Sequence, residues 1–193
     1  MDALAERASE GGGARERLIA ELREHALVIG EVTLTSGAKA QYYVDAKRAI
    51  LRPRGFAALG ELLAAQLDGW GATAVGGLTM GADPVACAAL AGGANVNAFF
   101  VRKQTKAHGL QRRIEGPLLS AQDRCAVVED VVTTGGSTLA AIEALNEQGL
   151  HICGVISVLD RLAGAGAAIE AAARAPYLAL TTIDDVYAER PDR

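Results

Sequence analysis

Apolar residues lie along the chain in two alternating patterns, short continuous runs and longer segments in which apolar positions recur with the period of a helix. The short runs are typical of parallel strands covered on both faces, and the periodic segments are typical of helices with one buried side. This alternation predicts an α/β fold, an open, mainly parallel sheet flanked by helices, with right-handed crossovers. The predicted strands are Thr73–Leu78, Val96–Arg102, Cys125–Val128, Ile152–Leu159 and Tyr177–Thr182, and the predicted helices are Pro53–Leu67, Val85–Gly92, Leu139–Gly149 and Leu162–Arg174.

The segment before the first of these helices predicts a smaller unit. Residues 1–13 end in three consecutive glycines and are expected to be flexible. The next apolar positions lie on one side of a helix that would serve as a lid or flank: Leu18, Ile19, Leu22 and Leu27. Glu31–Asp45 then predicts a β-hairpin with a Ser-Gly turn. In this hairpin, Tyr42 and Tyr43 are either half-exposed strand residues or rings presented to a flat aromatic substrate.

Composition and charge narrow the possible functions. The chain has 193 residues, of which 50% are hydrophobic, 22% charged and 4% aromatic, as in an ordinary globular protein. Because it shows no internal repeat or linker, residues 1–193 are predicted to form one domain. A net charge of −4 argues against general nucleic-acid binding, which needs an excess of lysine and arginine. With no apolar run of about 18 residues and no charged-then-hydrophobic leader, the chain is expected to be cytoplasmic, without membrane association.

Three cysteines are scattered singly, at Cys87, Cys125 and Cys153, among small and apolar residues. Their spacing does not match a metal-binding pattern, and buried cysteines are seldom reactive. They are predicted to fill the core as small hydrophobic residues.

The segment Cys125–Ser137, with the sequence CAVVEDVVTTGGS, carries the most specific chemistry. It predicts a buried strand with Glu129 and Asp130 at its exit, followed by a glycine-rich loop with Ser137 as the N-cap of a helix. The free N–H groups at such a helix start bind phosphate, and carboxylates accept hydrogen bonds from a diol or face a divalent cation. A phosphorylated sugar has both kinds of group. The alternative is that the two acids only solvate the end of a strand.

A second unusual segment is strongly basic within an acidic protein. Between Val101 and Gly116, five cations and a histidine precede the first acid, Glu115: Arg102, Lys103, Lys106, His108, Arg112 and Arg113. Long loops in compact domains are usually functional, so we expect a mobile loop or flexible hairpin that acts on an anion. The alternatives are a solvated basic loop or, more weakly, an RNA-binding loop, which would normally carry interleaved aromatic residues.

These segments resemble a known family. CAVVEDVVTTGGS is similar to the phosphoribosyl-diphosphate signature of type I phosphoribosyltransferases, and we name residues 125–137 the signature segment. VRKQTKAHG resembles the catalytic loop of orotate phosphoribosyltransferases, LTSGAKAQYYVD resembles part of their N-terminal hood, and VLDR ends in Arg161, which matches an arginine that contacts orotate. The matches run from about Leu27 to Tyr187 in the family's order. Residues 14–45 would then be the hood and its flanking helix.

The resemblance implies transfer of 5-phosphoribosyl from phosphoribosyl diphosphate to orotate, giving orotidine 5′-monophosphate and diphosphate in pyrimidine biosynthesis. It implies Mg²⁺ held mainly by the substrate and water, with no protein metal ligand assigned, and a homodimer in which each basic loop reaches the partner's site. Lys106 and His108 would be catalytic, and Thr133 and Arg161 would bind orotate. The residues implied for phosphoribosyl diphosphate are Arg102, Lys103, Lys106, His108, Glu129, Asp130, Val131, Val132, Thr133, Thr134, Gly135, Gly136 and Ser137.

The chain departs from the family pattern at two places, where many bacterial members carry a lysine and this chain has Thr35 and Met80-Gly81. Both changes remove a positive charge expected near the anionic ligands. Two other functions stay open, a purine or xanthine phosphoribosyltransferase and a non-catalytic regulator that uses the fold to sense the sugar diphosphate.

Overall fold

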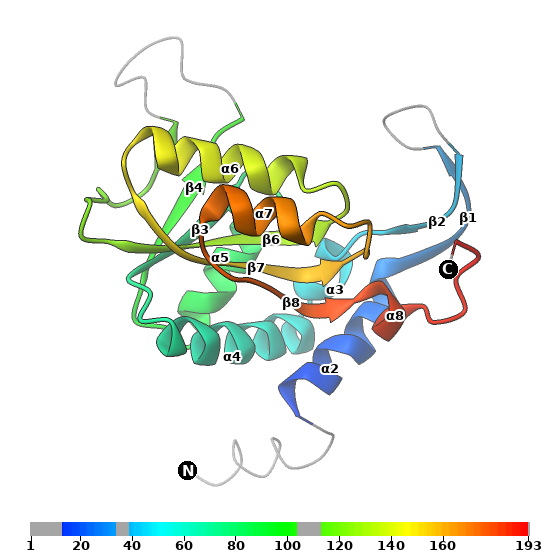
Figure 1. Cartoon of the computed structure of the whole chain (residues 1–193). Helices are drawn as coiled ribbons and strands as arrows, with labels where there is room; N and C mark the ends of the chain where they lie inside the picture. The colour runs from blue at the N-terminus through cyan, green and yellow to red at the C-terminus, as the bar shows by residue number, and fades with distance from the viewer. Residues whose placement is uncertain (1–12, 34–38, 104–112, 193) are drawn as a thin grey trace, which may run out of the picture.

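The computed structural model describes residues 13–33, 39–103 and 113–192. Its centre is a six-stranded sheet in the order β5-β4-β3-β6-β7-β8, in which all strands are parallel except β5 at one edge (Figure 1). This confirms the predicted mainly parallel α/β fold. The strands are β3 (Ala74–Leu78), β4 (Asn97–Val101), β5 (Ile114–Glu115), β6 (Arg124–Val132), β7 (His151–Asp160) and β8 (Tyr177–Thr182).

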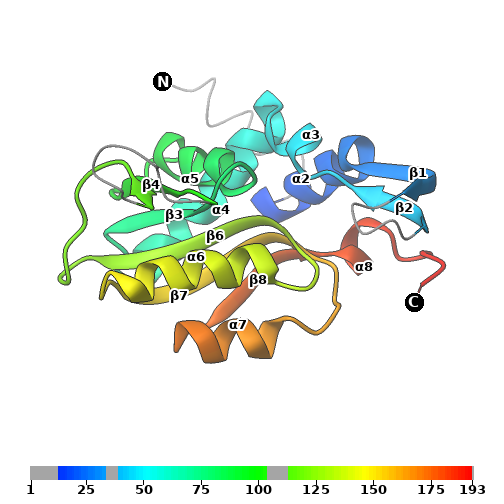
Figure 2. The same ribbon diagram turned by 90° about the horizontal axis from the view of Figure 1, so that it is seen from above.

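Helices cover both faces of the sheet, as the view from above shows (Figure 2). One face carries α4 (Pro53–Gly69) and α5 (Ala82–Ala91), and the other carries α6 (Gly136–Glu147) and α7 (Gly166–Ala173). Alternate residues of β6 serve the two cores: Ala126 and Val128 pack with the α4 and α5 side, and Cys125 and Val127 with the α6 and α7 side. The run is therefore buried on both faces, as its uninterrupted apolar sequence predicts.

The N-terminal unit lies beyond the carboxyl ends of β6, β7 and β8 (Figure 2). It contains α2 (Ala14–Glu21), the π-helical turn η1 (Leu22–Ala26), an antiparallel pair of β1 (Leu27–Thr33) and β2 (Lys39–Val44), and α3 (Lys47–Ile50). The predicted helix and hairpin are both present, but Leu27 begins the strand and does not continue the helix. Of the segment 1–13 that was predicted to be flexible, residues 1–12 lie outside the described residues, and so does the turn at Ser36-Gly37.

Strand β6 is longer than its apolar run predicts. Its partner β7 continues to Asp160, and their pairing extends to Val132, so Glu129 and Asp130 lie within the strand and not after it. On its other side β6 pairs with β3 only as far as Val127. The end of β6 therefore projects past β3, next to the turn that enters α5.

Trp70, which follows α4, packs against the sheet near the amino ends of its strands. Its ring lies on Gly154 of β7, where an added Cβ would be 2.3 Å from a ring carbon. Arg124 at the start of β6 holds the same turn, because its Nη2 donates a hydrogen bond of 2.9 Å to the Trp70 carbonyl. The last helix, α8 (Ile183–Val186), lies near the N-terminal unit (Figure 1).

Two further observations bear on the sequence predictions. Cys125 and Cys153 are buried as predicted, whereas Cys87 is exposed on the outer side of α5 and does not fill the core. Across residues 13–33, 39–103 and 113–192, no helix has the length and apolarity needed to cross a membrane.

Candidate active site

The signature segment ends in the loop that leads into α6. Gly135 precedes the helix with φ of +79°, a conformation that favours glycine, and its carbonyl accepts the N–H of Leu139 at 2.8 Å. The N–H groups of the first turn, which includes Gly136 and Ser137, therefore have no partner within the helix. Ser137 was predicted to be the N-cap, but the helix begins one residue before it and Ser137 is exposed in the first turn.

The carboxyl pair, Glu129 and Asp130, lies at the projecting end of β6 and is almost fully buried, with 4% and 7% exposure. Asp130 uses both oxygens: Oδ1 accepts the N–H of Val131 at 2.8 Å, and Oδ2 accepts Nζ of Lys47 at 2.8 Å. Glu129 Oε1 accepts the Asp130 N–H at 3.2 Å, whereas Oε2 is buried without a hydrogen-bond partner among the described residues. The two carboxyl groups therefore differ. Asp130 is held by an ion pair with Lys47, whereas Glu129 has one oxygen without a hydrogen-bond partner among the described residues.

Burial raises the pKa of Glu129 to about 9, and a side-chain hydrogen bond with Asp130 and the repulsion from its charge add to the rise, whereas the Asp130 N–H and the charge of Lys47 oppose it. For Lys47, burial lowers the pKa, but the hydrogen bonds and attraction of Asp130 and Asp45 outweigh burial, so the pKa lies above its ordinary value. Burial and the neighbouring carboxyl group therefore favour the protonated form of Glu129, and the two aspartates favour the charged form of Lys47.

Lys47 was not predicted as a site residue. It begins α3, next to the hairpin, and reaches Asp130 across 83 residues of sequence. A lysine two positions after an aspartate has no distinctive pattern, so only the packing of the N-terminal unit against β6 reveals it.

The two ends of the basic segment, Arg102 and Arg113, leave the sheet together, because the Arg102 N–H donates to the Arg113 carbonyl at 2.8 Å. Arg102 and Lys103 are exposed and line a cavity of about 490 Å³ with Thr79 and Phe100. The predicted catalytic residues, Lys106 and His108, and the predicted Arg112 lie outside the described residues.

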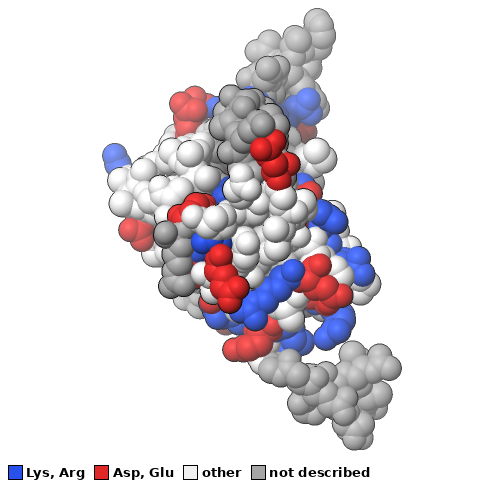
Figure 3. Space-filling model, turned by 90° about the vertical axis from the view of Figure 1, so that its right-hand side faces the viewer, with Lys and Arg blue, Asp and Glu red and all other residues white. Residues whose placement is uncertain are grey.

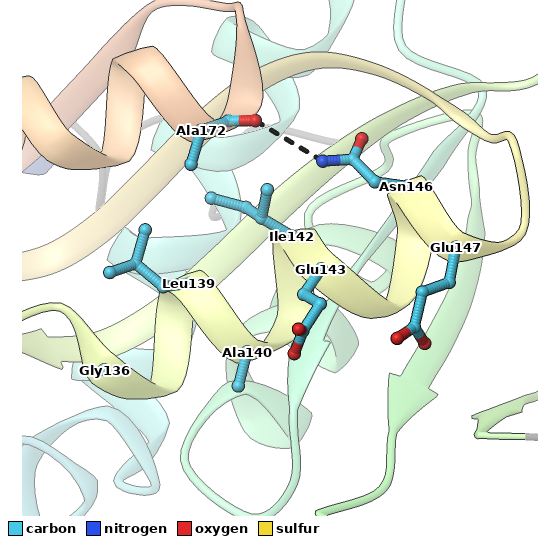
Figure 4. Close-up of a pocket in the computed structure, with 8 residues that line it drawn as sticks. All are labelled: Gly136, Leu139, Ala140, Ile142, Glu143, Asn146, Glu147 and Ala172. Carbon is cyan, nitrogen blue, oxygen red and sulfur yellow. Dashed lines mark hydrogen bonds between the residues drawn. The ribbon is translucent and has the colours of Figure 1, made fainter.

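Arg113 fastens this segment to α6. Its Nη2 donates to the Ala140 carbonyl at 3.3 Å, and its Nη1 lies 3.5 Å from Glu147 and 3.7 Å from Glu143. These glutamates rim a cavity of about 660 Å³, an open groove between α6 and α7 (Figure 4). The groove lies on the outer side of α6 and is lined mainly by Leu139, Ala140, Ile142 and Ala172, so it lacks the groups expected of a site for a phosphorylated sugar.

Arg161 follows β7 directly, and its N–H donates to the Val132 carbonyl at 2.9 Å, which joins it to the signature segment. Its guanidinium carbon lies 4.8 Å from the centre of the Tyr42 ring. Asp192 approaches both residues: its Oδ2 is 3.8 Å from Arg161 Nη2 and accepts the Tyr42 hydroxyl at 2.9 Å. Arg161 Nε is buried without a hydrogen-bond partner in the described residues.

The paired tyrosines of the hairpin therefore differ. Tyr42 is buried between Arg161 and Tyr187, whereas Tyr43 is 40% exposed. Of the two interpretations left open, half-exposure holds only for Tyr43. Thr133 is half-buried and directly follows β6, as Arg161 directly follows the neighbouring strand β7.

The face that carries the hairpin, α8 and the C-terminal residues mixes acidic and basic side chains, without a large patch of one sign among the residues drawn in colour (Figure 3). No group of three or more His, Cys, Asp or Glu that could hold a metal ion occurs among the described residues. The carboxyl pair offers hard oxygen donors, one of them unpartnered, which suit Mg²⁺ only if a substrate supplies further oxygens.

Comparison with known proteins assigns the family. No family model matches the chain. The curated orotate phosphoribosyltransferase of Corynebacterium glutamicum strain R is 49% identical over 174 residues, which cover 90% of this chain and 94% of that protein. The chain belongs to the orotate phosphoribosyltransferase family.

Solved structures of this family agree. A crystal structure of Mycobacterium tuberculosis H37Rv orotate phosphoribosyltransferase with Fe(III) dicitrate is similar with a TM-score of 0.81 and 43% identity, covering 90% of this chain and 99% of that one. A structure of the same enzyme with 5-phospho-α-D-ribosyl 1-diphosphate has a TM-score of 0.77 and 38% identity, covering 90% and 98%. The family resemblance and the type I phosphoribosyltransferase fold inferred from the sequence are confirmed.

Proposed function

We propose that this orotate phosphoribosyltransferase moves 5-phosphoribosyl from phosphoribosyl diphosphate to N1 of orotate, giving orotidine 5′-monophosphate and diphosphate for pyrimidine biosynthesis. The observation that carries the proposal is the buried carboxyl pair beside the open N-terminus of α6. The carboxyl pair suits the hydroxyls of a ribose, and the N–H groups at the start of α6 suit its phosphate. A relative in this family is known in complex with the same sugar diphosphate.

The sugar would bind along the signature segment. Glu129 and Asp130 would hold the ribose hydroxyls, and a protonated Glu129 can donate to a hydroxyl through Oε2. The 5-phosphate would lie against the N–H groups of the first turn of α6. The segment assigned to the phosphate is Thr133, Thr134, Gly135, Gly136 and Ser137, and Val131 and Val132 would contribute through their backbone.

The reaction breaks the bond from C1 to the diphosphate oxygen, so positive charge develops on the ring and negative charge on the leaving group. Preorganised donors at the leaving group are worth about 3–4 kcal/mol each. We assign this role to Arg102, Lys103, Lys106 and His108, with Lys106 or His108 as the proton donor. Arg102 and Lys103 line the cavity beside β4, where the diphosphate would leave.

Orotate is a flat anion. Arg161 would pair with its carboxylate or ring oxygens, and Thr133 would approach the ring from the loop of the signature segment. The position of Asp192, 3.8 Å from the Arg161 guanidinium, supports this assignment because a carboxylate of the chain itself is already attracted there. The missing partner of Arg161 Nε leaves a donor for the substrate.

Mg²⁺ would be held mainly by the diphosphate and by water, and it would neutralise the charge of the leaving group. The residues nearest to it would be the carboxyl pair. A homodimer in which the basic segment, residues 102–113, reaches the partner's site is also proposed, and its length allows a reach of roughly 3.3 Å per residue. The single-domain organisation and the cytoplasmic location stay predictions.

The deciding experiment incubates the purified protein with phosphoribosyl diphosphate, Mg²⁺ and either orotate, adenine, hypoxanthine or xanthine. Loss of orotate absorbance with formation of diphosphate is expected, and the purines should remain unchanged. Turnover of a purine in place of orotate would favour the purine enzyme. Binding of the sugar diphosphate with no turnover of any base would favour the regulator.

The shared-site dimer has its own test. Lys106→Ala and Asp130→Asn subunits, each nearly inactive, should recover part of the activity after mixing and exchange, because one site of the heterodimer receives both changes and the other receives neither. If heterodimers form and activity stays at the level of the parents, the loop acts within its own chain.

A further inference from the structure

Lys47 touches the carboxyl pair from outside the sheet. Its Nζ lies 2.8 Å from Asp130 Oδ2 and 3.1 Å from Asp45 Oδ1. Since the other oxygen of Asp130 accepts the Val131 N–H, the lysine completes the hydrogen bonding of this carboxylate and fixes its rotation.

The lysine itself is held by the core of the N-terminal unit. Asp45, which precedes α3, donates its N–H to the Ala26 carbonyl at 2.9 Å and accepts the Lys47 N–H at 3.2 Å. Ala49 and Ile50, in the same short helix, are fully buried. The position of the ammonium group is therefore set by packed backbone, as a preorganised contact requires.

The charges of this cluster suit the reaction. Two adjacent buried carboxyls are costly to ionise together, and the ammonium group of Lys47, 2.8 Å from Asp130 Oδ2, offsets part of that cost by pairing with Asp130. Lys47, Asp45 and Asp130 together then carry one net negative charge. A developing cation on the ribose ring is attracted by that net charge, although the lysine alone would repel it.

We infer that Lys47 is a positioning residue for phosphoribosyl transfer, which holds Asp130 in the orientation that receives the ribose hydroxyls. The inference rests on the proposed function and adds to it a link between the N-terminal unit and the sugar site. Lys47 acts through Asp130 and not by contact with the substrate. A side chain that is 36% exposed is also accessible enough to be replaced without opening the core.

The test compares Lys47→Met, Lys47→Arg and Asp130→Asn with the double variant Lys47→Met/Asp130→Asn. Lys47→Met keeps the length of the side chain and removes its charge. We expect kcat/KM for phosphoribosyl diphosphate to fall on the order of 100-fold, as for a catalytic group displaced by about 1 Å. Lys47→Arg should recover most of the loss, and the KM for orotate should change little.

In the double variant, Lys47→Met should add less than about threefold to the loss caused by Asp130→Asn, because the two residues act as one unit. If the loss in the double variant equals the product of the losses in the two single variants, the inference is overturned, because Lys47 would then contact the substrate independently of Asp130. Wild-type kinetics in Lys47→Met would overturn it as well. Arg48→Met is the matched control, an exposed cation on the same helix, and should behave as wild type.

Calorimetric binding of phosphoribosyl diphosphate with Mg²⁺ separates this inference from the proposed function. If wild-type protein binds the sugar diphosphate but does not consume orotate, the proposed function fails while the effect of Lys47→Met on binding can still be measured. Weaker binding of phosphoribosyl diphosphate by Lys47→Met, together with near-normal binding by Lys47→Arg, supports the positioning role. Unchanged binding, with melting temperatures of the variants alike, refutes it.

Discussion

Gly81, at the turn between β3 and α5, gives the sharpest steric test of the carboxyl pair. A Cβ at this position would be 2.5 Å from Asp130 Oδ1 and 2.9 Å from Glu129 Oε1. Ordinary contacts of a Cβ begin at 3.4 Å, so Gly81→Ala must displace the Asp130 carboxylate by roughly 1 Å. A displacement of about this size costs on the order of 100-fold in rate, or about 2.7 kcal/mol of transition-state stabilisation.

The fold should tolerate the same change. Gly81 has φ of −65° and ψ of −42°, values that alanine adopts readily. Replacing glycine by alanine in such a conformation shifts stability by no more than about 1 kcal/mol. The expected result is therefore a large loss of kcat/KM, followed by orotate absorbance, with a melting temperature close to wild type.

Gly69→Ala is the control, because Gly69 ends α4 and an added methyl group there would have nothing within 4 Å. It should leave both activity and melting temperature unchanged. Activity of Gly81→Ala within threefold of wild type, in a folded protein, would show that catalysis does not depend on the present position of the Asp130 carboxylate.

Three further outcomes are expected. The pKa of Glu129 is raised from an ordinary 4.5 to about 9 in the folded state. Between these two pH values the folded protein therefore keeps a proton that the unfolded chain releases. The contribution of this group to the free energy of unfolding should fall as pH rises from about 4.5 to about 9. Urea unfolding at several pH values measures it, and the same change of the free energy of unfolding with pH in wild type and Glu129→Gln would contradict the prediction. Arg113→Ala should lower kcat/KM with a loss of stability below about 1 kcal/mol, because its ion pairs with α6 are near the surface; a large drop in melting temperature would show a structural role instead. Phe99→Ala should cost about 3–5 kcal/mol in chemical unfolding, because Phe99 is fully buried, and a cost below about 1 kcal/mol would show that the core closes over the gap.

The sheet could be predicted from sequence because its signals are local. Apolar runs such as Tyr177–Thr182 form the strand at the same bounds, and Pro53 at the first turn of α4 marks the start of that helix as its chemistry predicts. The signature segment was also recognisable, since its acids, glycines and hydroxyl residues follow one another along a single strand-to-helix turn.

What the sequence could not provide depends on partners distant in the chain. The length of β6 depends on the pairing of Val132 with Asp160, and the hydrogen bonding of the Asp130 carboxylate depends on Lys47. The exposure of Cys87 follows from which side of α5 faces the sheet, and an alanine-rich helix does not encode that side clearly. Gly135 replaces Ser137 as the cap because its left-handed conformation, which has no local polar signal, ends the loop earlier.

The packing of Trp70 against Gly154 decides how this protein can be followed by fluorescence. Trp70 is the single tryptophan of the chain, and it lies at the amino ends of the strands. Along β6, Glu129 is five residues from Arg124, or roughly 17 Å at the usual rise of a strand. Intrinsic emission will therefore report loss of the core on unfolding and stay silent when a ligand enters at the opposite edge. An emission signal for binding needs a second indole near the site, and the exposed Tyr43 of the hairpin is the position at which Tyr43→Trp would supply it.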